Sequence, residues 1–345
     1  MEILITGGAG FIGSNLAARG LREEYRVVVF DNLSRPGTRW NLEWLQSLGP
    51  VEFVEGDVRD FSALRGLFER RRFDAVFHQA AQVAVTLSVE DPRTDFEVNA
   101  LGTFNLLEAI RCSGQNPVVI FSSTNKVYGS LAQFEVEERN GRYAFKDLPK
   151  GVPETSPLDF HSPYGCSKGC ADQYMADYRR IYGLRTIVFR QSCIYGPRQI
   201  GLEDQGWLAW FTICAVLGRP ITIYGDGKQV RDVLYIDDLV DLYFRAVECE
   251  PSLETFVFNV GGGPMQAVSL REVIQMLERE LGRPITLRFA DWRPGDQRVY
   301  VSDISRVAHV FGWRPTVSVS DGIKRLVEWV WENRATLALL VEERA

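Results

Sequence analysis

The sequence predicts an α/β protein with a Rossmann-like doubly wound parallel sheet and a smaller α/β C-terminal substrate lobe. Short apolar runs recur through the first half of the chain, at Ile3–Ile5, Val27–Phe30, Val51–Val54, Ala75–Phe77 and Val118–Phe121. Runs of this length without polar alternation are typical of parallel strands that are buried on both faces. Amphipathic segments with helical spacing separate them, at Ser14–Glu24, Ser62–Arg70 and Thr103–Ser113. The alternation of the two patterns indicates repeated βαβ units.

The sequence pattern changes after Tyr195, where Gly-Pro, Gly-Arg-Pro and Gly-Asp-Gly motifs interrupt short helical and strand-like segments. Such motifs mark turns and loops. We therefore expect residues 1–195 to form mainly the cofactor-binding domain, with the catalytic residues, and residues 196–345 to form mainly a substrate lobe. A strand near 256–260 is expected to return to the main sheet.

Composition excludes several classes of protein. The 345 residues are 46% hydrophobic and carry a net charge of −6, so a large core is expected and a nucleic-acid partner is not. The first residues run directly into a glycine-rich turn without a leader or membrane-spanning run, which predicts a soluble, cytoplasmic protein with no membrane partner. The six cysteines form no C-x-x-C pair and there are three histidines, so no metal site is expected.

A glycine-rich turn follows the first predicted strand and opens the first helix. Its members are Gly7, Gly10, Phe11, Ile12 and Gly13. Glycines let the turn tighten and let backbone N–H groups approach a pyrophosphate, which the helix N-terminus also attracts. This context predicts a dinucleotide site.

Asp31 ends the second predicted strand, 18 residues beyond Gly13. A carboxylate there can accept hydrogen bonds from both ribose hydroxyls, and it would repel a 2′-phosphate, so NAD is expected rather than NADP. Asn32, Ser34 and Arg35 follow in the same loop. Arg35 either binds a phosphate, which would favour NADP, or stacks on adenine.

Asp57 and Val58 follow the third predicted strand. An acid at this place can accept a hydrogen bond from the adenine amine, although a loop acid with no ligand explains the spacing equally well.

Tyr164 and Lys168 are four residues apart at the start of a long amphipathic segment, so they share one helix face. A tyrosine with its ordinary pKa near ~10 is a poor base at neutral pH until a nearby ammonium stabilises the phenolate. The pair alone is also common on helix surfaces. Ser122-Ser123-Thr124 comes after the strand Val118–Phe121, at the edge where ligands of open α/β sheets gather. We expect Thr124 to bind the oxygen that Tyr164 deprotonates, while Ser122 or Ser123 could equally cap a helix or turn.

These motifs together resemble the extended short-chain dehydrogenase/reductase family. The matching strings are Thr6–Gly13, His78–Ala81, Asn99–Thr103, Tyr128-Gly129 and Tyr164/Lys168. The resemblance implies that Thr124, Tyr164 and Lys168 form the catalytic triad and that the C-terminal lobe holds a nucleotide sugar. It also implies a row of further NAD contacts, at Asp31, Asp57, Val58, Ala80, Ala81, Gln82, Asn99 and Ser122.

Longer strings indicate which sugar chemistry the resemblance favours. Ser122–Gly129, Leu158–Gly169 and Asp204–Trp207 are similar to the 2-epimerases of CDP-sugars, of the CDP-paratose/CDP-tyvelose or CDP-glucose/CDP-mannose type. The resemblance implies a CDP-hexose substrate and an NAD-dependent isomerase that works through a 2-keto intermediate. The 4,6-dehydratases of the family place Asp-Glu where this chain has Asn125-Lys126, and an amide cannot take up the proton that dehydration requires.

The expected substrate contacts lie mostly in the second half of the chain. Arg231 and Arg293 suit diphosphate oxygens, and Asp296 suits a ribose hydroxyl, although as isolated motifs both segments also fit surface turns. Weaker candidates for the sugar contacts are His161, Gln191, Arg198 and Gln205.

Two other functions stay open at this point. One is a 4-epimerase or reductase that acts on other nucleotide sugars, and the other is a non-catalytic regulator that senses NAD. The stripe of Tyr174, Tyr178 and Tyr182 on one helix face indicates either packing or a homodimer face, and the oligomer is expected to be a dimer or tetramer.

Overall fold

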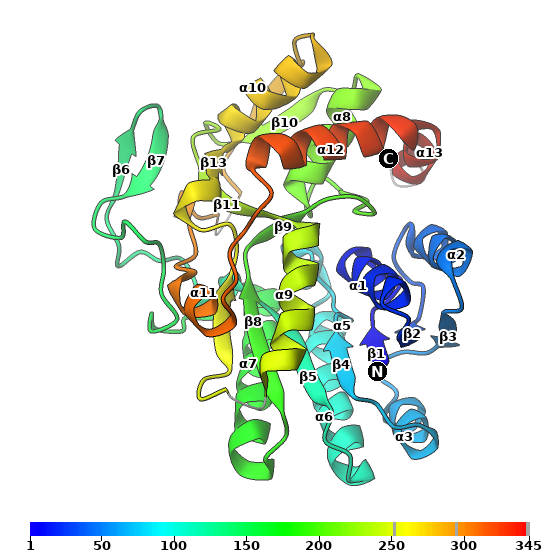
Figure 1. Cartoon of the computed structure of the whole chain (residues 1–345). Coiled ribbons are helices and arrows are strands. Elements are labelled where there is room, and N and C mark those ends of the chain that lie inside the picture. Colours follow the sequence, from blue (N-terminus) through cyan, green and yellow to red (C-terminus); the bar gives the residue numbers. More distant parts are fainter. Residues whose placement is uncertain (251–252, 294–295, 343–345) are drawn as a thin grey trace. The chain divides into compact units, whose positions relative to one another are not determined.

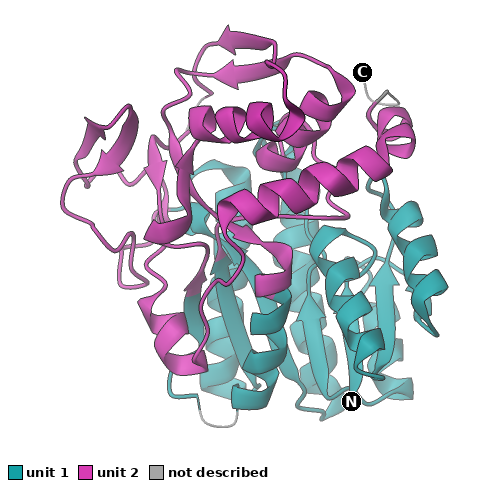
Figure 2. Cartoon of the chain, turned by 45° about the horizontal axis from the view of Figure 1, so that its top comes forward, with its two compact units in different colours: residues 1–127, 160–190, 240–258 teal, residues 128–159, 191–239, 259–345 magenta. Residues whose placement is uncertain are grey.

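The computed structural model describes residues 1–250, 253–293 and 296–342 of the chain. Two compact units divide it, coloured separately in Figure 2. Unit 1 comprises residues 1–127, 160–190 and 240–258, and unit 2 comprises residues 128–159, 191–239 and 259–345. Each unit is therefore assembled from three separate segments of the sequence.

A seven-stranded sheet organises unit 1, in the order β12-β8-β5-β4-β1-β2-β3 (Figure 1). The pairs β1·β2, β1·β4, β2·β3 and β4·β5 are parallel. The strands are β1 (Glu2–Thr6), β2 (Arg26–Asp31), β3 (Glu52–Glu55), β4 (Ala75–His78), β5 (Val118–Thr124), β8 (Thr186–Gln191) and β12 (Val257–Val260). The strand order reverses between β1 and β4, which is the switch point of a doubly wound fold. The predicted fold class is confirmed.

Two strands differ from the sequence-based expectation. β3 has exposed glutamates at both ends and half-buried Phe53 and Val54 between them, so the prediction that it is buried on both faces is wrong. It is one of the two edge strands of the sheet, so it has a neighbouring strand on one side only. β5 continues through Thr124, so Ser122 and Thr124 are the carboxyl end of the strand rather than a loop after it.

Helices follow the strands of unit 1 and begin up to three residues before the predicted segments. They are α1 (Phe11–Arg22), α2 (Thr38–Leu48), α3 (Phe61–Arg70), α4 (Val85–Glu90), α5 (Pro92–Phe96), α6 (Gly102–Ser113), α7 (Ser162–Tyr182) and most of α9 (Ile236–Cys249). A π-helical turn, η1 (Glu97–Leu101), joins α5 to α6, and the 3-10 turn η2 (Asn125–Tyr128) follows β5. The helix α2 was absent from the expected pattern.

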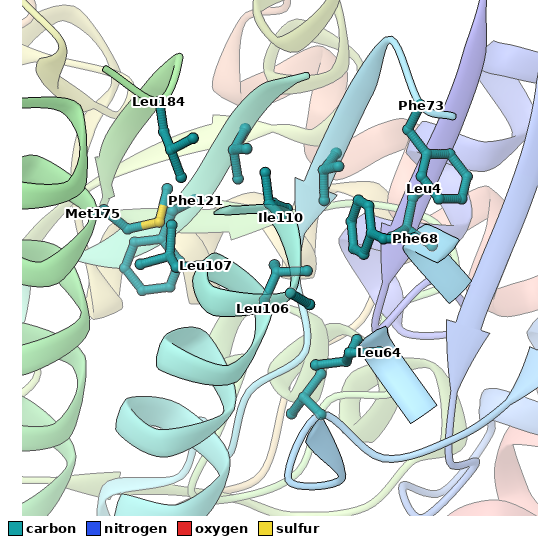
Figure 3. Close-up of a cluster of buried hydrophobic side chains, with 14 of the residues drawn as sticks. Leu4, Leu64, Phe68, Phe73, Leu106, Leu107, Ile110, Phe121, Met175 and Leu184 are labelled. Atoms are coloured by element: carbon teal, nitrogen blue, oxygen red, sulfur yellow. The ribbon is translucent and has the colours of Figure 1, made fainter. Parts of the chain in front are cut away.

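A cluster of buried apolar side chains fastens α3, α6 and α7 to the sheet (Figure 3). Leu4, Phe121 and Val188 contribute from the strands, and Leu106 and Met175 contribute from α6 and α7. Each fully buried side chain of this size stabilises the fold by about 1.5–3 kcal/mol. This core fixes α7, which carries Tyr164 and Lys168, relative to the carboxyl end of β5.

His78 links the switch point to a helix. It ends β4 opposite Thr6 of β1, and its ring contacts the Thr6 hydroxyl at 2.7 Å and the Thr103 hydroxyl at 2.9 Å. Burial, together with the charge of Lys168, lowers the pKa of His78 to about 3. The ring is therefore a neutral connector between the start of the glycine-rich turn and α6.

Unit 2 consists of short strands and peripheral helices. Its strands are β6 (Val136–Arg139), β7 (Arg142–Phe145), β9 (Cys193–Tyr195), β10 (Ile221–Tyr224), β11 (Val230–Tyr235), β13 (Ala267–Ser269), β14 (Leu287–Ala290) and β15 (Val299–Tyr300). Its helices are α8 (Trp207–Leu217), α10 (Leu270–Leu281), α11 (Ser305–Phe311), α12 (Val319–Glu332) and α13 (Arg334–Glu342), with the 3-10 turn η4 (Pro264–Gln266). A capping box of Ser269 and Glu272 starts α10, as expected for a serine followed by a glutamate three residues later.

Among the residues that the structure describes, no helix combines the length and the apolar character that a bilayer crossing requires.

Candidate active site

The glycine-rich turn between β1 and α1 packs too closely for side chains at Gly7, Gly8 and Gly13. Gly7 has φ +66°, and a Cβ there would lie 2.5 Å from the backbone nitrogen of Ala80. A Cβ on Gly13 would lie 2.2 Å from the carbonyl oxygen of Gly7. Gly10 precedes the helix without a side-chain cap, which leaves the first N–H groups of α1 for another acceptor. Phe11 and Ile12 are the first residues of the helix. The five predicted residues therefore lie together in the glycine-rich turn and the first turn of α1, an arrangement that fits a pyrophosphate.

Asp31 stands at the carboxyl end of β2 and is 8% exposed. One of its oxygens accepts from the Ala9 backbone N–H at 3.0 Å, and the other accepts from that of Leu33 at 2.8 Å. Burial raises the pKa of Asp31, and these two bonds and the charge of Arg35 oppose the rise. Each oxygen keeps a second lone pair, so the carboxylate fits the two hydroxyls of a ribose.

Asn32 and Asp57 are brought together, from the loops after β2 and β3. Asn32 Nδ2 donates to Asp57 at 2.8 Å, and Arg59 donates to the same carboxylate at 2.7 Å. The bonds from Arg59 hold the pKa of Asp57 down at about 2. Val58 is buried, and its carbonyl accepts from Asn105. The sequence analysis did not predict the contact between Arg59 and Asp57. The position of an arginine two residues after Asp57 was the signal that could have indicated it.

The loop after β4 is tied to the π-helical turn. Gln82 donates its backbone N–H to Asn99 Oδ1 at 3.0 Å, and Asn99 Nδ2 donates to the Gln82 carbonyl at 3.0 Å. Ala80 and Ala81 are half-buried in the same loop, next to Gly7. The residues predicted along the cofactor are therefore adjacent to one another.

Thr124 and Tyr164 meet through their hydroxyls. Thr124 is the last residue of β5 and Tyr164 lies in the first turn of α7, which begins with Pro163 near its N-terminus. The pKa of Tyr164 is raised to about 12, because burial and the charge of Asp95 raise it by more than the hydrogen bond to Thr124 and the charge of Arg35 lower it. Two of the three predicted catalytic side chains are thus in direct contact.

Lys168 is buried one turn after Tyr164, and its ammonium lies 4.1 Å from the centroid of the Phe121 ring. Burial lowers the pKa of Lys168 to about 7, and the charges of Asp172 and Asp95 oppose this. The ammonium thus sits over an aromatic face, and its predicted action on the Tyr164 phenolate stays a prediction.

Ser122 and Ser123 point to different partners. Ser122 donates to Gln79 Oε1 at 2.5 Å and contacts the Tyr243 hydroxyl at 2.8 Å. Ser123 donates to Asp172 at 2.6 Å. Tyr243 and Asp172 were missed by sequence reasoning because each lies far along the chain from the serine that it meets.

Arg231 and Asp296, predicted separately, form one ion pair in unit 2. Arg231 Nη2 lies 2.7 Å from Asp296 Oδ1 and 2.6 Å from the Gln297 carbonyl. Arg293 instead places its guanidinium 4.0 Å from the centroid of the Tyr224 ring and donates to the Glu203 carbonyl at 3.0 Å. Pro294 and Gly295, which complete that predicted turn, lie outside the described residues.

The weaker candidates are dispersed over both units. His161, in unit 1, is the exposed residue that precedes α7. In unit 2, Gln191 is buried at the end of β8 and Gln205 exchanges backbone hydrogen bonds with Leu202. Arg198 adopts φ +72°, and burial lowers its pKa to about 10. Within the described parts of the chain, no group of acidic, cysteine or histidine side chains is arranged to hold a metal ion.

Comparison with known proteins gives a consistent result. The family model described as the NAD dependent epimerase/dehydratase family matches residues 3–261. The chain is 48% identical to CDP-paratose 2-epimerase of Salmonella typhi, over 95% of this chain and 99% of that protein. It is 36% identical to UDP-glucose 4-epimerase of Mycolicibacterium smegmatis, over 95% and 98% of the two chains.

Solved structures agree with this. The chain is similar to UDP-glucose 4-epimerase of Thermotoga maritima, solved with UDP-glucose, at 32% identity and a TM-score of 0.83 over 96% and 99% of the two chains. It is also similar to the dTDP-glucose 4,6-dehydratase of Streptomyces venezuelae, solved with NAD, at 31% identity and a TM-score of 0.84 over 99% and 100%. The extended short-chain dehydrogenase/reductase resemblance and the NAD cofactor are confirmed. This chain belongs to the NAD-dependent epimerase/dehydratase family.

Proposed function

We propose that this protein inverts the configuration at C2 of a CDP-hexose through a transient 2-keto sugar. The observation that carries the proposal is the 48% identity to a CDP-paratose 2-epimerase along nearly the full length of both chains. The paired hydroxyls of Thr124 and Tyr164 support it, because they provide a base and a hydrogen-bond partner for one sugar hydroxyl.

The C2 hydrogen of a sugar is not acidic, so inversion requires oxidation and reduction at that carbon. Bound NAD supplies the hydride acceptor for the first half and the hydride donor for the second. Tyr164 takes the proton of the C2 hydroxyl and later returns it, while Thr124 hydrogen-bonds to the same oxygen. Lys168, as an ammonium, favours the phenolate form of Tyr164. The ketone turns its other face toward the cofactor before it is reduced, so no net redox change occurs.

The residues around NAD are assigned by the same proposal. The glycine-rich turn binds the pyrophosphate, Asp31 binds the adenosine ribose, and Arg35 stacks on adenine. Asn32, Ser34, Asp57, Val58, Ala80, Ala81, Gln82, Asn99 and Ser122 complete the cofactor contacts. Residues 1–195 then act mainly on NAD and residues 196–345 mainly on the substrate.

Arg231 and Arg293 are proposed to hold the diphosphate, with Asp296 on the ribose of the nucleotide. Their contacts support this, because Arg231 presents a guanidinium that already pairs with a carboxylate oxygen and could pair with a phosphate oxygen in the same geometry. His161, Gln191, Arg198 and Gln205 are proposed to contact the sugar.

A 4-epimerase is the second candidate, since UDP-glucose 4-epimerases are similar over almost the whole chain. Dehydration across C5 and C6 is disfavoured by Asn125. Its side-chain oxygen accepts from the Thr124 hydroxyl at 3.3 Å, and its amide acts as neither an acid nor a base at neutral pH.

The experiment is incubation of the purified protein with CDP-paratose, CDP-glucose and UDP-glucose, with the products identified by NMR. The proposal predicts C2 epimers of a CDP-sugar. Formation of UDP-galactose at a greater rate would establish the 4-epimerase instead.

A substrate deuterated at C2 separates hydride transfer from proton exchange. Retention of deuterium in the epimer is expected, because the same hydride returns to the same carbon. Loss of the label to solvent would exclude the oxidation and reduction sequence.

A second copy of the chain is the proposed macromolecular partner. Apolar side chains are exposed along the neighbouring elements η1, α6 and α7, at Leu101 (36%), Phe104 (36%), Tyr174 (43%), Ile181 (66%) and Tyr182 (50%). A patch of this kind on one face is typical of an association surface. Sedimentation of Ile181→Asp as a monomer, with the wild type as a dimer or tetramer, would support it. The cytoplasmic location stays a prediction.

A further inference from the structure

Asp95 is a buried carboxylate that the proposed chemistry does not use. It lies in α5 with 0% exposure. Its Oδ2 accepts from the Ser167 hydroxyl at 2.5 Å, and its Oδ1 accepts from Gln82 Nε2 at 3.0 Å and from Asn99 Nδ2 at 3.1 Å. A group so fully buried among donors requires a structural or functional reason.

The three donors come from three functional segments. Gln82 belongs to the loop after β4 that is proposed to contact NAD, and its amide also bonds both the N–H and the carbonyl of Ala84. Asn99 is the central residue of the π-helical turn, and such turns occur frequently at functional sites. Ser167 lies between Tyr164 and Lys168 on α7. One carboxylate therefore joins the cofactor loop, the π-turn and the catalytic helix.

The charge of Asp95 also acts on the catalytic pair. The groups that face Lys168 are Asp95 from α5, Asp172 from its own helix, the neutral ring of His78 from β4 and the Phe121 ring from β5. Asp172 is bound by the Arg190 guanidinium at 2.9 and 3.0 Å, so a cation compensates its charge. The Ser167, Gln82 and Asn99 donors to Asp95 are neutral, and the charge of Lys168 acts on its carboxylate. Asp95 is thus, with Asp172, one of two negative charges that act on Lys168.

We propose that Asp95 is a positioning residue, which locks the NAD-facing loop to the catalytic helix and sets the protonation of the Tyr164–Lys168 pair. Its hydrogen bonds described above are all to side chains of the protein. All three partners donate to it, so it acts as a carboxylate, and an uncharged amide in its place would turn an N–H group toward at least one of these donors.

The direction of the electrostatic effect follows from the sign of the charge. A negative charge disfavours deprotonation of both neighbours, and Asp95 raises the pKa of Tyr164 and of Lys168. Its removal should lower both pKa values. The inference rests on the proposed roles of Tyr164 and Lys168, but the following test uses no sugar substrate, so it can fail or succeed independently of the CDP-sugar assignment.

The test titrates the near-ultraviolet phenolate band of the NAD-loaded enzyme, with the spectrum of the matching Tyr164→Phe protein subtracted at each pH. Asp95→Asn should move the Tyr164 titration to lower pH by about 1 unit, the lower end of what a neighbouring charge does. The matched control is Glu250→Gln, which removes another buried carboxylate of unit 1, paired with Arg179 and Arg185. It should leave the titration unchanged. A titration that is equal in wild type and Asp95→Asn, or shifted as far by the control, overturns the electrostatic role.

The second proposed role of Asp95, the connection between the NAD-facing loop and the catalytic helix, is tested by the affinity for NAD. This affinity is measured by quenching of protein fluorescence. Asp95→Asn and Ser167→Ala should each weaken NAD binding by about 10-fold. The double variant should bind NAD no more weakly than the more strongly affected single variant, because both substitutions remove the same connection. Additive losses, or NAD affinity within twofold of wild type in Asp95→Asn, would overturn the connection. If Asp95→Asn does not fold, Asp95→Ser carries the same expectations.

Discussion

The proposed catalytic side chains of unit 1 and the arginines of unit 2 are held in different ways. Tyr164 bonds to another hydroxyl, and the Lys168 ammonium rests on an aromatic ring. Arg231, in contrast, donates to a carboxylate and a carbonyl of its own unit. Neither of these proposed catalytic groups forms a hydrogen-bonded ion pair in the described structure. The proposed diphosphate ligand, in contrast, must share or displace acceptors that Arg231 already has.

This contrast separates reactivity from recognition. Buried groups have shifted pKa values, as Tyr164 and Lys168 do, and such shifts are frequent where proton transfer takes place. Paired arginines keep their geometry in the absence of ligand, so that less side-chain entropy is lost on binding. Substitutions in the two regions should accordingly affect different measured quantities.

The largest effect is expected from Tyr164→Phe. Removal of the hydroxyl abolishes proton transfer, so turnover should fall by about 10³-fold, while the NAD content of the purified protein stays equal to wild type. Turnover is measured by NMR of the epimer and NAD content by release on denaturation. A variant with turnover within tenfold of wild type would remove the distinction between the two regions.

Arg231→Met should change binding rather than chemistry. Loss of a charge-assisted bond costs about 2 kcal/mol, so the Kd for CDP should rise roughly 30-fold, as measured by calorimetry. The control is Asp296→Asn, which keeps the shape and removes the anion beside Arg231, and its effect should be several times smaller. Equal affinity for CDP in Arg231→Met and wild type would contradict the recognition role.

Asp31→Ala should weaken NAD binding by about 10-fold through the loss of hydrogen bonds to the ribose. The preference for NAD over NADP should shrink at the same time, since the carboxylate no longer repels a 2′-phosphate. Fluorescence titration with both dinucleotides measures this, and an unchanged ratio of the two affinities would count against the assignment.

Stability as a function of pH tests the burial of Lys168 separately. Lys168 has a pKa of about 7 in the folded chain and an ordinary value of about 10.4 in the unfolded chain. Between these values the unfolded chain binds a proton that the native chain does not, so stability from this residue increases with pH. Wild type should therefore gain in Tm relative to Lys168→Met as the pH is raised from 7 to 10. A constant difference would show that Lys168 stays charged throughout.

The sequence predicts much of unit 1 because its signals are local. Apolar runs identify β1, β2, β4 and β5, and the glycine turn and Asp31 fall at strand ends where the fold needs them. The error at β3 has a physical cause. β3 lies at an edge of the sheet, where fewer elements cover a strand than in the sheet interior, so the exposed Glu52 and Glu55 are tolerated. The end of β5 was misplaced because Ser122 and Thr124 resemble loop residues, although their backbone continues the strand.

The unpredicted parts depend on contacts between distant segments. The ion pair of Arg231 with Asp296 joins positions 65 residues apart, and the bond from Ser167 to Asp95 spans 72. The spacing of apolar and polar residues along the sequence gives no information about such a pair. Asp95 in particular has no motif around it, and its place at the meeting point of three segments is visible only once the chain is folded. The roles of the predicted site residues accordingly stay predictions for the experiments above.

The neutral, buried imidazole of His78 has a consequence for the stability of the fold at acid pH. An unfolded histidine takes up a proton near pH 6.5, whereas this one resists until about pH 3. Across that interval protons bind the unfolded chain preferentially, so each step of acidification draws the native population toward unfolding. Since the same ring ties Thr6 to Thr103, the dinucleotide turn and α6 lose a common tether together. Acid inactivation should therefore begin with release of NAD.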